Sequence, residues 1–320
     1  MPRALLIYNP NAGRFSPEKA ARRTAEHLRD RGWEIDVEAT RDADHVSELA
    51  ARAAANELDA LIVAGGDGSI GRAVCGLLET GTALGVLPTG TANVWAKELG
   101  LPRIGAGGLD AVLANAELLA GSRVKRVDVG LCNREPFLLW AGIGLDAIVV
   151  RGAERNRSHF KKSFVLPEYF LRTLSAAHHW PGAEVEITGV RRDSTEKIAY
   201  SGRIQLAVVT NIRRYAGGYG QLSPEAAVDD GEMDLWIFHG RGASAALRNA
   251  WNLLRGAHVH KKDTIRMPFQ RLIVRSERPV AIHTDGEAAA DTERIELLVC
   301  RHALKILVPS TAKKPYGQET

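Results

Sequence analysis

One short run in the first third of the chain has the composition of a phosphate-binding turn. The residues Gly65-Gly66-Asp67-Gly68-Ser69 follow an apolar stretch and precede a helix-like spacing of apolar residues. Such a turn directs unpaired N–H groups and the positive end of a helix dipole at one point, where anionic phosphates bind. Asp67 would repel a phosphate unless Mg²⁺ or water lay between them, and Ser69 is well placed as the helix N-cap. The run matches neither the Walker nor the Rossmann spacing, so on its own it also fits a plain β–α turn.

Three further polar turns follow apolar stretches in the same region. They contain Asn9, Pro10, Asn11, Ala12, Gly13 and Arg14, then Thr40, and then Thr89, Gly90, Thr91 and Asn93. In a parallel α/β sheet the carboxyl ends of the strands share one edge, and ligands bind at that edge. The four turns together therefore predict one ligand site.

Carboxylates supply the second kind of candidate chemistry. Asp285 and Glu287 flank a glycine in HTDGE, Asp128 lies in KRVDVG, and Asp230 lies in VDDGEMD. Each position also has an ordinary structural explanation. Asp-Gly is the strongest short signal for a type I′ hairpin turn, Asp128 could be a solvated acid at a strand end, and Asp230 could belong to a simple turn. These acids alone do not identify a reaction.

The elements that must position these residues alternate between apolar strands and helices in the first third of the chain. We expect strands at 4–10, 33–40, 60–66 and 83–88, and helices at 17–32, 44–58 and 109–120. This alternation predicts parallel βαβ units with both sheet faces covered. The apolar start of the chain is too short for a signal peptide and is expected to be the first strand. No stretch is long and apolar enough to span a membrane.

After residues 125–130 the pattern changes to strands at hairpin-like spacing. Only two helical stretches interrupt them, at about 163–178 and 243–256, and this pattern predicts an antiparallel β-sandwich. The expected fold class is therefore an N-terminal parallel α/β domain over 1–128 and a C-terminal β-sandwich domain over 129–310. A cleft is expected between them, and residues 311–320 are expected to form a flexible tail.

The composition is that of a folded soluble protein large enough for two domains. Its 320 residues are 45% hydrophobic and 25% charged, and 42 basic against 38 acidic side chains give a net charge of +4. This weak basic excess suits an anionic substrate or membrane surface, and no nucleic-acid partner is expected. Cys75, Cys132 and Cys300 have no metal-ligand spacing, so we expect reduced core residues of a cytoplasmic protein.

Several motifs together resemble the diacylglycerol kinase catalytic-domain family, which includes bacterial lipid kinases and the sphingosine and ceramide kinases. They are NPNAGR, GGDGS and PTGTANVWAKELGLP, in this order and spacing. The resemblance continues into the β domain through AAVDDGEMDLWI (226–237) and HTDGE (283–287), so it covers most of the chain. NAD kinases and 6-phosphofructokinases share the GGDG element, and the pairing of GGDG with GTAN makes the resemblance specific.

The resemblance implies a role for each candidate residue. One of Asp285 and Glu287 would accept the proton of a lipid hydroxyl as its oxygen attacks the γ-phosphorus of ATP, with Asp67 and Asp128 in a Mg²⁺–water network. A structural Mg²⁺ or Ca²⁺ would be held by the Asp230 side chain and the carbonyls of Ala227 and Glu232. ATP would be bound in the first domain by Asn9, Pro10, Asn11, Ala12, Gly13, Arg14, Thr40, Gly65, Gly66, Asp67, Gly68, Ser69, Arg72, Thr89, Gly90, Thr91 and Asn93.

Residues 151–180 have the pattern of a membrane-contacting element. Basic residues come first, and the helix that follows them has one apolar face, as a peripheral enzyme needs at an anionic membrane surface. A core helix with a charged start fits the same pattern. The basic residues are Arg151, Arg155, Arg157, Lys161 and Lys162, and the apolar residues are Phe164, Leu166, Tyr169, Phe170 and Leu174. A second basic group, expected on a surface loop, comprises His258, His260, Lys261 and Lys262.

The chain departs from the family pattern at two places beside the predicted site where relatives often have an acid. Gly71 and Arg72 stand where relatives often have Asn-Glu, and Val94 stands where relatives often have an acid. Two missing acids leave fewer ways to organise Mg²⁺, so catalytic rate is affected more than nucleotide binding.

These motifs predict an ATP- and Mg²⁺-dependent kinase of a diacylglycerol-like or sphingoid lipid, acting transiently at a membrane surface, with a homo-oligomer left open. Two alternatives stay open. One is a nucleotide- or lipid-binding regulatory protein with little catalysis, and the other is an NAD-kinase-like phosphotransferase with a soluble substrate.

Overall fold

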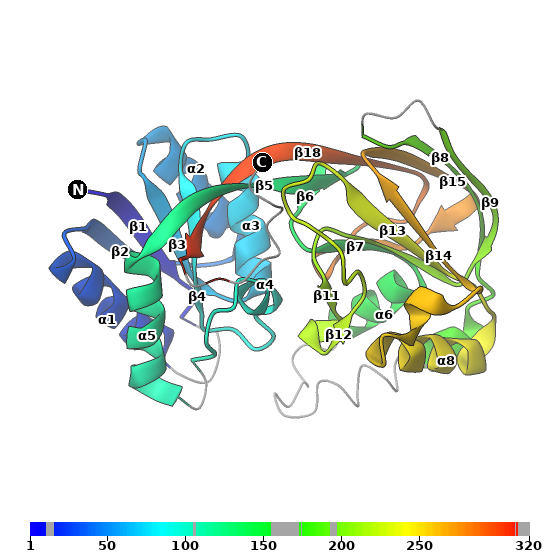
Figure 1. The fold of residues 1–320 in the computed structure, drawn as a ribbon, viewed down its shortest axis with the longest axis horizontal. Coiled ribbons are helices and arrows are strands. Elements are labelled where there is room, and N and C mark those ends of the chain that lie inside the picture. The colour runs from blue at the N-terminus through cyan, green and yellow to red at the C-terminus, as the bar shows by residue number, and fades with distance from the viewer. Residues whose placement is uncertain are drawn as a thin grey trace. The chain divides into compact units, whose positions relative to one another are not determined.

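The chain folds into two compact units in the computed structural model, which describes residues 1–10, 16–104, 107–154, 173, 175–192, 197–310 and 312. The first unit comprises Met1–Val129 and Arg301–Thr320, and the second comprises Gly130–Cys300. Figure 1 shows the chain passing from one unit to the other twice, through β5 (Ser122–Cys132) and β18 (Thr292–Pro309). Except for residue 312, the predicted flexible tail lies outside the described residues.

A parallel sheet forms the centre of the first unit, with the strand order β2-β1-β3-β4. The strands are β1 (Arg3–Tyr8), β2 (Glu34–Ala39), β3 (Ala60–Gly65) and β4 (Ala83–Pro88). The helices are α1 (Pro17–Asp30), α2 (Ala43–Ala55), α3 (Asp67–Leu77), α4 (Val94–Glu98) and α5 (Gly108–Ala120). β3 and β4 are buried along their whole length, as strands covered on both faces must be. The predicted α/β architecture is confirmed.

Pairs of helices pack closely beside this sheet. α1 and α5 lie side by side (Figure 1), and Leu28 and Val112 from these helices join Leu6 and Ile62 of the sheet in one apolar core. α2 and α3 approach each other so closely that a methyl carbon added at Gly76 would lie 2.6 Å from the backbone nitrogen of α2 at residue 51. The helices therefore exclude water from the sheet and hold the turns at its edge in place.

The last strand differs from the expectation. The sequence predicts two separate strands within 294–300 and 303–309, both in the second domain, whereas β18 is one strand of 18 residues. Its first part pairs antiparallel with β15 (Arg271–Val280), and near its end Ile306 pairs with Leu84 of β4 in the parallel direction. Residues 301–310 therefore belong to the first unit, because the end of β18 extends the parallel sheet.

Two sheets of antiparallel strands make up the second unit and confirm the predicted β-sandwich. One sheet has the order β14-β13-β10-β7-β16-β17, and β18, β15, β8 and β9 follow one another in the other. Ile143, Val209 and Leu235 from the first sheet meet Val185 and Leu272 from the second in the core between them. The strands are β6 (Glu135–Phe137), β7 (Trp140–Gly144), β8 (Ala183–Val190), β9 (Lys197–Ile204), β10 (Leu206–Thr210), β11 (Arg214–Tyr215), β12 (Gly220–Gln221), β13 (Met233–Phe238), β14 (Thr264–Phe269), β16 (Ile282–Thr284) and β17 (Glu287–Ala288).

Two longer helices, two short 3₁₀ turns and helical residues at 173 and 175–179 complete the described part of the second unit. The longer helices and the turns are α6 (Leu145–Glu154), η3 (Ala216–Gly218), α8 (Gly242–Leu254) and η4 (Ala257–His260). α8 confirms the helix predicted at 243–256, whereas α6 is not among the predicted elements. Of the helix expected at 163–178, the structure describes residues 173 and 175–178, and these are helical. No helix in the described part of the chain has the length and apolar character needed to cross a membrane.

Candidate functional site

Backbone hydrogen bonds gather the four predicted turns of the first unit at one edge of the parallel sheet. The Asn9 N–H donates to the Ala64 carbonyl at 3.3 Å, and the Gly90 N–H donates to the Gly65 carbonyl at 3.1 Å. The Thr40 N–H donates to the last residue of β1 at 2.9 Å. The strand order thus brings these turns together, as the parallel topology predicts.

Two glycines from neighbouring turns are in direct contact. A methyl carbon added at Gly90 would lie 2.5 Å from the Cα of Gly66 and 2.6 Å from Oδ1 of Asn93. Gly66 is the N-cap of α3 and offers no side chain to the first turn of that helix. Packing therefore requires glycine at position 90, and the N terminus of α3 begins with bare backbone.

Two buried oxygen atoms of the fourth turn have no hydrogen-bond partner among the described residues. They are Oγ1 of Thr89 and Oδ1 of Asn93. The Nδ2 group of Asn93 donates to the carbonyls of Pro88 at 3.1 Å and Gly90 at 2.8 Å, which fixes Oδ1 toward the two glycines. A buried polar atom without a partner costs free energy, so this turn has the composition of a place that water, a metal ion or a ligand completes.

Asp67 links the glycine run to the fourth turn through its side chain. Its Oδ2 accepts the N–H of Val94 at 2.9 Å, and its Oδ1 accepts the N–H of Trp95 at 3.0 Å. These N–H groups open α4, whose N-cap residue Asn93 makes no side-chain capping bond, so Asp67 caps that helix. Burial raises the pKa of Asp67, and the two N–H groups act against the rise.

Other predicted nucleotide-binding residues take different places. Ser69 is not the N-cap of α3, because that helix begins two residues earlier, at Asp67. The guanidinium of Arg72 lies toward α2, with Nη1 3.9 Å from Oδ1 of Asp44. Gly68 and Thr91 are exposed. Asn11, Ala12, Gly13 and Arg14 lie outside the described residues, and Pro10, which precedes them, is exposed.

Asp128 is completely buried in β5, so it is not the solvated acid that the sequence left open. Its Oδ1 accepts the N–H of His302 at 2.7 Å. His302 has a left-handed backbone, with φ of 53°. This hydrogen bond therefore joins β5, at the end of Met1–Val129, to β18, through which the chain re-enters the first unit at Arg301.

In the second unit, Asp285 and Gly286 form the two-residue turn between β16 and β17. Their φ angles are 49° and 86°, as a type I′ hairpin requires. The Asp285 carboxylate accepts the backbone N–H groups of Leu138, Leu139 and Trp140 at 2.7, 2.8 and 3.0 Å. Asp285 therefore orders the chain that enters β7 as well as the hairpin.

Glu287 follows this turn and is half-buried. It pairs with Thr284 across the hairpin, while His283 pairs with Ala288. Because side chains alternate along a strand, Glu287 and His283 lie on opposite faces of the hairpin.

A buried histidine–aspartate pair lies beside this hairpin and was not predicted. Nε2 of His283 lies 2.7 Å from Oδ2 of Asp146 at the start of α6, and their side chains are 1% and 6% exposed. The Gly286 N–H donates to Nδ1 of His283 at 3.3 Å, so Nε2 carries the proton toward Asp146. Gly142 leaves the space for this pair, because a methyl carbon there would lie 2.2 Å from Nε2. In the sequence each of these two residues lies among apolar residues close to a glycine, and this pattern does not show that they meet.

Asp146 also lines an apolar cavity of about 290 Å³. The cavity lies among α6, α8 and the sheet, and its walls are mostly aliphatic and aromatic. Asp146, Asn249 and Thr173 add polar groups to these walls. Its apolar lining consists of Leu145, Val149, Leu206, Tyr215, Ala216, Phe238, Ala246, Ala250, Leu253 and Leu254. A small number of polar groups in an apolar cavity is typical of a site for an amphipathic ligand.

The Asp230 loop lies against guanidinium groups. Oδ1 of Asp230 accepts the Glu232 N–H at 3.0 Å, and the Asp230 carbonyl accepts from Arg192. Burial alone would raise the pKa of Glu232, but hydrogen bonds from the Arg191 side chain and the Arg192 backbone outweigh burial and lower it. No cluster of three metal-binding side chains occurs in the described part of the chain. The predicted set of one carboxylate and two carbonyls, including that of Ala227, stays a prediction.

Two further expectations need correction. Cys75 is exposed on α3 rather than buried, whereas Cys132 is buried and Cys300 half-buried; burial raises the pKa of the Cys132 thiol to about 12. His258 is not part of a basic surface group. It is 1% exposed, packs against the Trp236 ring at 5.0 Å and donates from Nε2 to a carbonyl at 2.7 Å.

Comparison with known proteins adds to this geometry. Residues 3–132 match the diacylglycerol kinase catalytic domain, and residues 140–308 match the YegS C-terminal NAD kinase beta sandwich-like domain. A diacylglycerol kinase of Bacillus subtilis is 30% identical over 289 residues, covering 90% of both chains. One from Mycobacterium tuberculosis is 28% identical over 310 residues, covering 95% of this chain and 94% of the relative. The fold is also that of a Bacillus anthracis diacylglycerol kinase crystal structure, with a TM-score of 0.72, 22% identity and coverage of 97% and 98%.

Proposed function

Because the chain belongs to the diacylglycerol kinase catalytic-domain family, a family of phosphotransferases, we propose that it transfers the γ-phosphoryl group of ATP to a lipid hydroxyl. The acceptor is a diacylglycerol-like or sphingoid lipid. The observation that carries the lipid part of this proposal is the apolar cavity with Asp146 and Asn249 in its wall. A soluble substrate such as a dinucleotide would not need such a lining.

The sheet edge of the first unit is the proposed place for the phosphates of ATP. Gly66 presents bare backbone at the N terminus of α3, where N–H groups and the helix dipole attract an anion. The contact between Gly66 and Gly90 brings two turns to the same point. Thr40 and Asn9 lie at neighbouring strand ends, so we place the rest of the nucleotide along them.

The same turn suits the magnesium ion that accompanies ATP. Oγ1 of Thr89 and Oδ1 of Asn93 have no partner in the described part of the chain, and oxygen is the ligand type that Mg²⁺ takes. Asp67 would contribute through water, since one lone pair of each of its oxygens is engaged by backbone N–H groups. When bound, Mg²⁺ supplies positive charge that stabilises the transferred phosphoryl group.

We assign the proton-accepting role to Glu287 rather than Asp285. Three backbone N–H groups already engage the Asp285 carboxylate, and a carboxylate offers about four lone-pair sites. Asp285 then acts by positioning the turn that carries Glu287. Asp146, held by His283, supplies a fixed polar group for the head of the lipid while the apolar walls bind its chains.

A kinase assay with a cavity variant tests the proposal. Purified protein with radiolabelled ATP, Mg²⁺ and mixed micelles of diacylglycerol or sphingosine should yield labelled lipid. Ala250→Phe places a ring in the cavity and should raise KM for long-chain lipid about tenfold, with ATP affinity unchanged. Leu298→Phe, at an exposed position on β18, is the matched control.

The departures at Arg72 and Val94 motivate the second candidate, a nucleotide- or lipid-binding protein with little catalysis. ATP binding without any labelled product would favour it over the kinase. Labelled NAD in the same assay, with no labelled lipid, would instead favour a phosphotransferase for a soluble substrate.

A further inference from the structure

The outer side of α8 exposes apolar side chains at helical spacing. Leu247, Trp251 and Leu254 are 43%, 58% and 44% exposed. Their spacing of four and then three residues places them on one side of the helix. The opposite side is buried through Ala245, Ala246, Asn249 and Leu253. α8 therefore packs one face against the second unit and exposes a second, apolar face to solvent.

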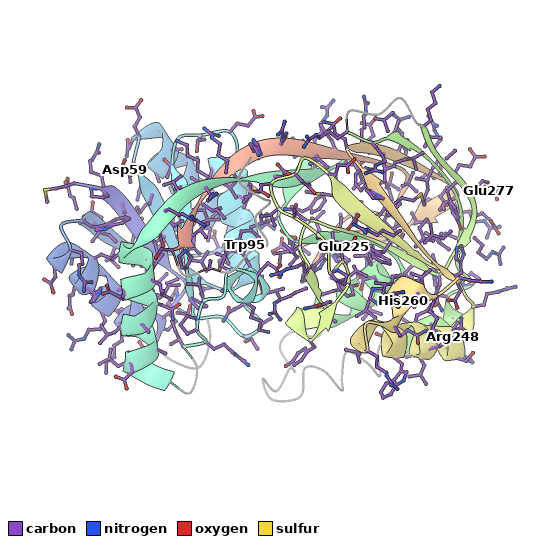
Figure 2. The ribbon with its side chains drawn as sticks, viewed as in Figure 1. Asp59, Trp95, Glu225, Arg248, His260 and Glu277 are labelled. Carbon is purple, nitrogen blue, oxygen red and sulfur yellow. The ribbon has the colours of Figure 1, made fainter. Side chains whose placement is uncertain are left out.

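Positive charge lies along one flank of this second face. Residues 241–262 contain five Lys or Arg side chains and no Asp or Glu. Arg241, Arg248 and Arg255 are seven residues apart, so they lie along one side of the helix, and Arg255 lies 5.6 Å from the Trp251 ring centroid. Arg248 pairs with Asp263 at 3.1 Å, but both groups are solvent-exposed, and such pairs contribute little. Figure 2 shows Arg248 on α8 and His260 close to that helix.

The same helix forms part of the cavity wall. Ala250, Leu253 and Leu254 line the cavity, and Leu254 is also exposed at the outer face. Tyr219, 63% exposed, lies next to this helix, because a methyl carbon at Gly220 would be 2.6 Å from the Leu253 side chain. Exposed apolar surface is therefore continuous with the cavity lining at Leu254.

We propose that this face of α8, with Trp251 at its centre and Arg248, Arg255, Lys261 and Lys262 beside it, binds the surface of an anionic lipid bilayer. The apolar side chains enter the region between headgroups and acyl chains, where tryptophan is favoured, and the cations bind anionic headgroups. A bilayer bound at this face would bring lipid next to the cavity, and this consequence rests on the proposed function. The binding of the bilayer itself does not.

Charge argues against a second copy of the chain as the occupant. A symmetric dimer would place this face against itself. Its exposed cations would then meet like charges, whereas an anionic bilayer neutralises them.

Vesicle sedimentation tests the proposal. Full-length protein should bind vesicles of equimolar phosphatidylcholine and phosphatidylglycerol and bind pure phosphatidylcholine much more weakly. Trp251→Ala should reduce affinity about tenfold, and Arg255→Gln about fivefold at low salt. Leu298→Ser, which removes an exposed apolar side chain on β18, is the control and should leave affinity unchanged. The tryptophan emission of the protein should shift to the blue on binding, and this shift should be smaller in Trp251→Phe, which keeps the other tryptophans.

The outcomes separate this inference from the proposed function. Unchanged vesicle affinity in Trp251→Ala and Arg255→Gln, with circular dichroism and Tm as in the unaltered protein, would overturn the inference. If the protein were a dimer and Trp251→Ala made it a monomer without changing vesicle binding, the face would be a self-association surface. This result would also overturn the inference. A monomeric short-chain lipid should be phosphorylated equally by Trp251→Ala and the unaltered protein. If neither protein phosphorylated this lipid, the proposed kinase activity would be rejected, and the conclusion from vesicle binding would be unaffected.

Discussion

Three carboxylates that the sequence presents as candidates for catalysis accept backbone hydrogen bonds in the structure. Asp67 binds the start of α4, Asp128 binds the N–H of His302, and Asp285 binds three N–H groups before β7. Charged acceptors make stronger hydrogen bonds to N–H groups than neutral ones do. Each acid therefore holds a backbone segment in place, and residue type alone could not separate this role from a catalytic one.

Asp285 and Glu287 should respond differently to the loss of one oxygen. Glu287→Gln should lower kcat by roughly 10²–10⁴-fold. Asp285→Asn should lower the free energy of unfolding by about 1–3 kcal/mol, because its amide nitrogen cannot accept the N–H groups of 138–140. Urea unfolding and initial rates on the same preparations measure both. Equal kcat for Glu287→Gln and the unaltered enzyme would mean that another group accepts the proton.

Gly90 should be intolerant of any side chain. Gly90→Ala puts a carbon within 2.6 Å of Gly66 Cα and Asn93 Oδ1, so the two turns must separate. We expect a loss of about 1–3 kcal/mol in stability and at least tenfold weaker ATP binding by calorimetry. Gly81→Ala is the matched control, because a methyl carbon there meets no atom within 4 Å. Full ATP affinity in Gly90→Ala would remove the glycine contact from the nucleotide site.

At the scale of elements, local sequence predicted most of the first unit. β3, β4 and the helices between the strands were expected from apolar runs and spacing, and their bounds differ by only a few residues. α6 was not predicted because it begins directly after Gly144, whose φ of 80° turns the chain out of β7. The His283–Asp146 pair could not be predicted either, since the two residues meet only through the pairing of β16 with β7.

The turn η4 should make stability depend on pH through His258. Burial lowers the pKa of His258 from its ordinary value of 6.5, with the Leu222 carbonyl acting against this change. The unfolded chain therefore binds a proton at a higher pH than the folded protein. The stability that the neutral ring contributes is complete above about pH 6.5 and is lost as the pH falls from there through the lower folded pKa.

His258→Phe should make the free energy of unfolding less dependent on pH in that range, as measured by urea unfolding at a series of pH values. His260→Phe alters an exposed neighbour and should keep the original slope. If His258→Phe retained the full slope, another group would be responsible for it.

At the scale of the whole molecule, the first unit is completed by a segment distant in sequence. The sequence pattern divided β18 into two strands of the second domain, because the polar residues Arg301 and His302 interrupt its apolar run. In the structure these polar residues lie within the single strand β18, where His302 has a left-handed backbone and its N–H donates to Asp128. Pairing of Ile306 with Leu84 involves residues more than two hundred positions apart, which local periodicity cannot reveal.

A chain ending at Cys300 should therefore lose the first unit and keep the second. It lacks Leu307 from the apolar core and Ile306 from the sheet edge, and large apolar core residues contribute about 2–5 kcal/mol each. It also leaves the Asp128 carboxylate buried without the His302 N–H, a further cost of about 1–3 kcal/mol. Together these losses are comparable to the whole stability of a domain. Hydrogen exchange should show rapid exchange in β3 and retained protection in β10 and β13, and ATP binding should disappear. A chain ending at Ala312 keeps all of β18 and should behave as the full chain; protected β3 amides in the shorter chain would show that the first 129 residues fold without their returning strand.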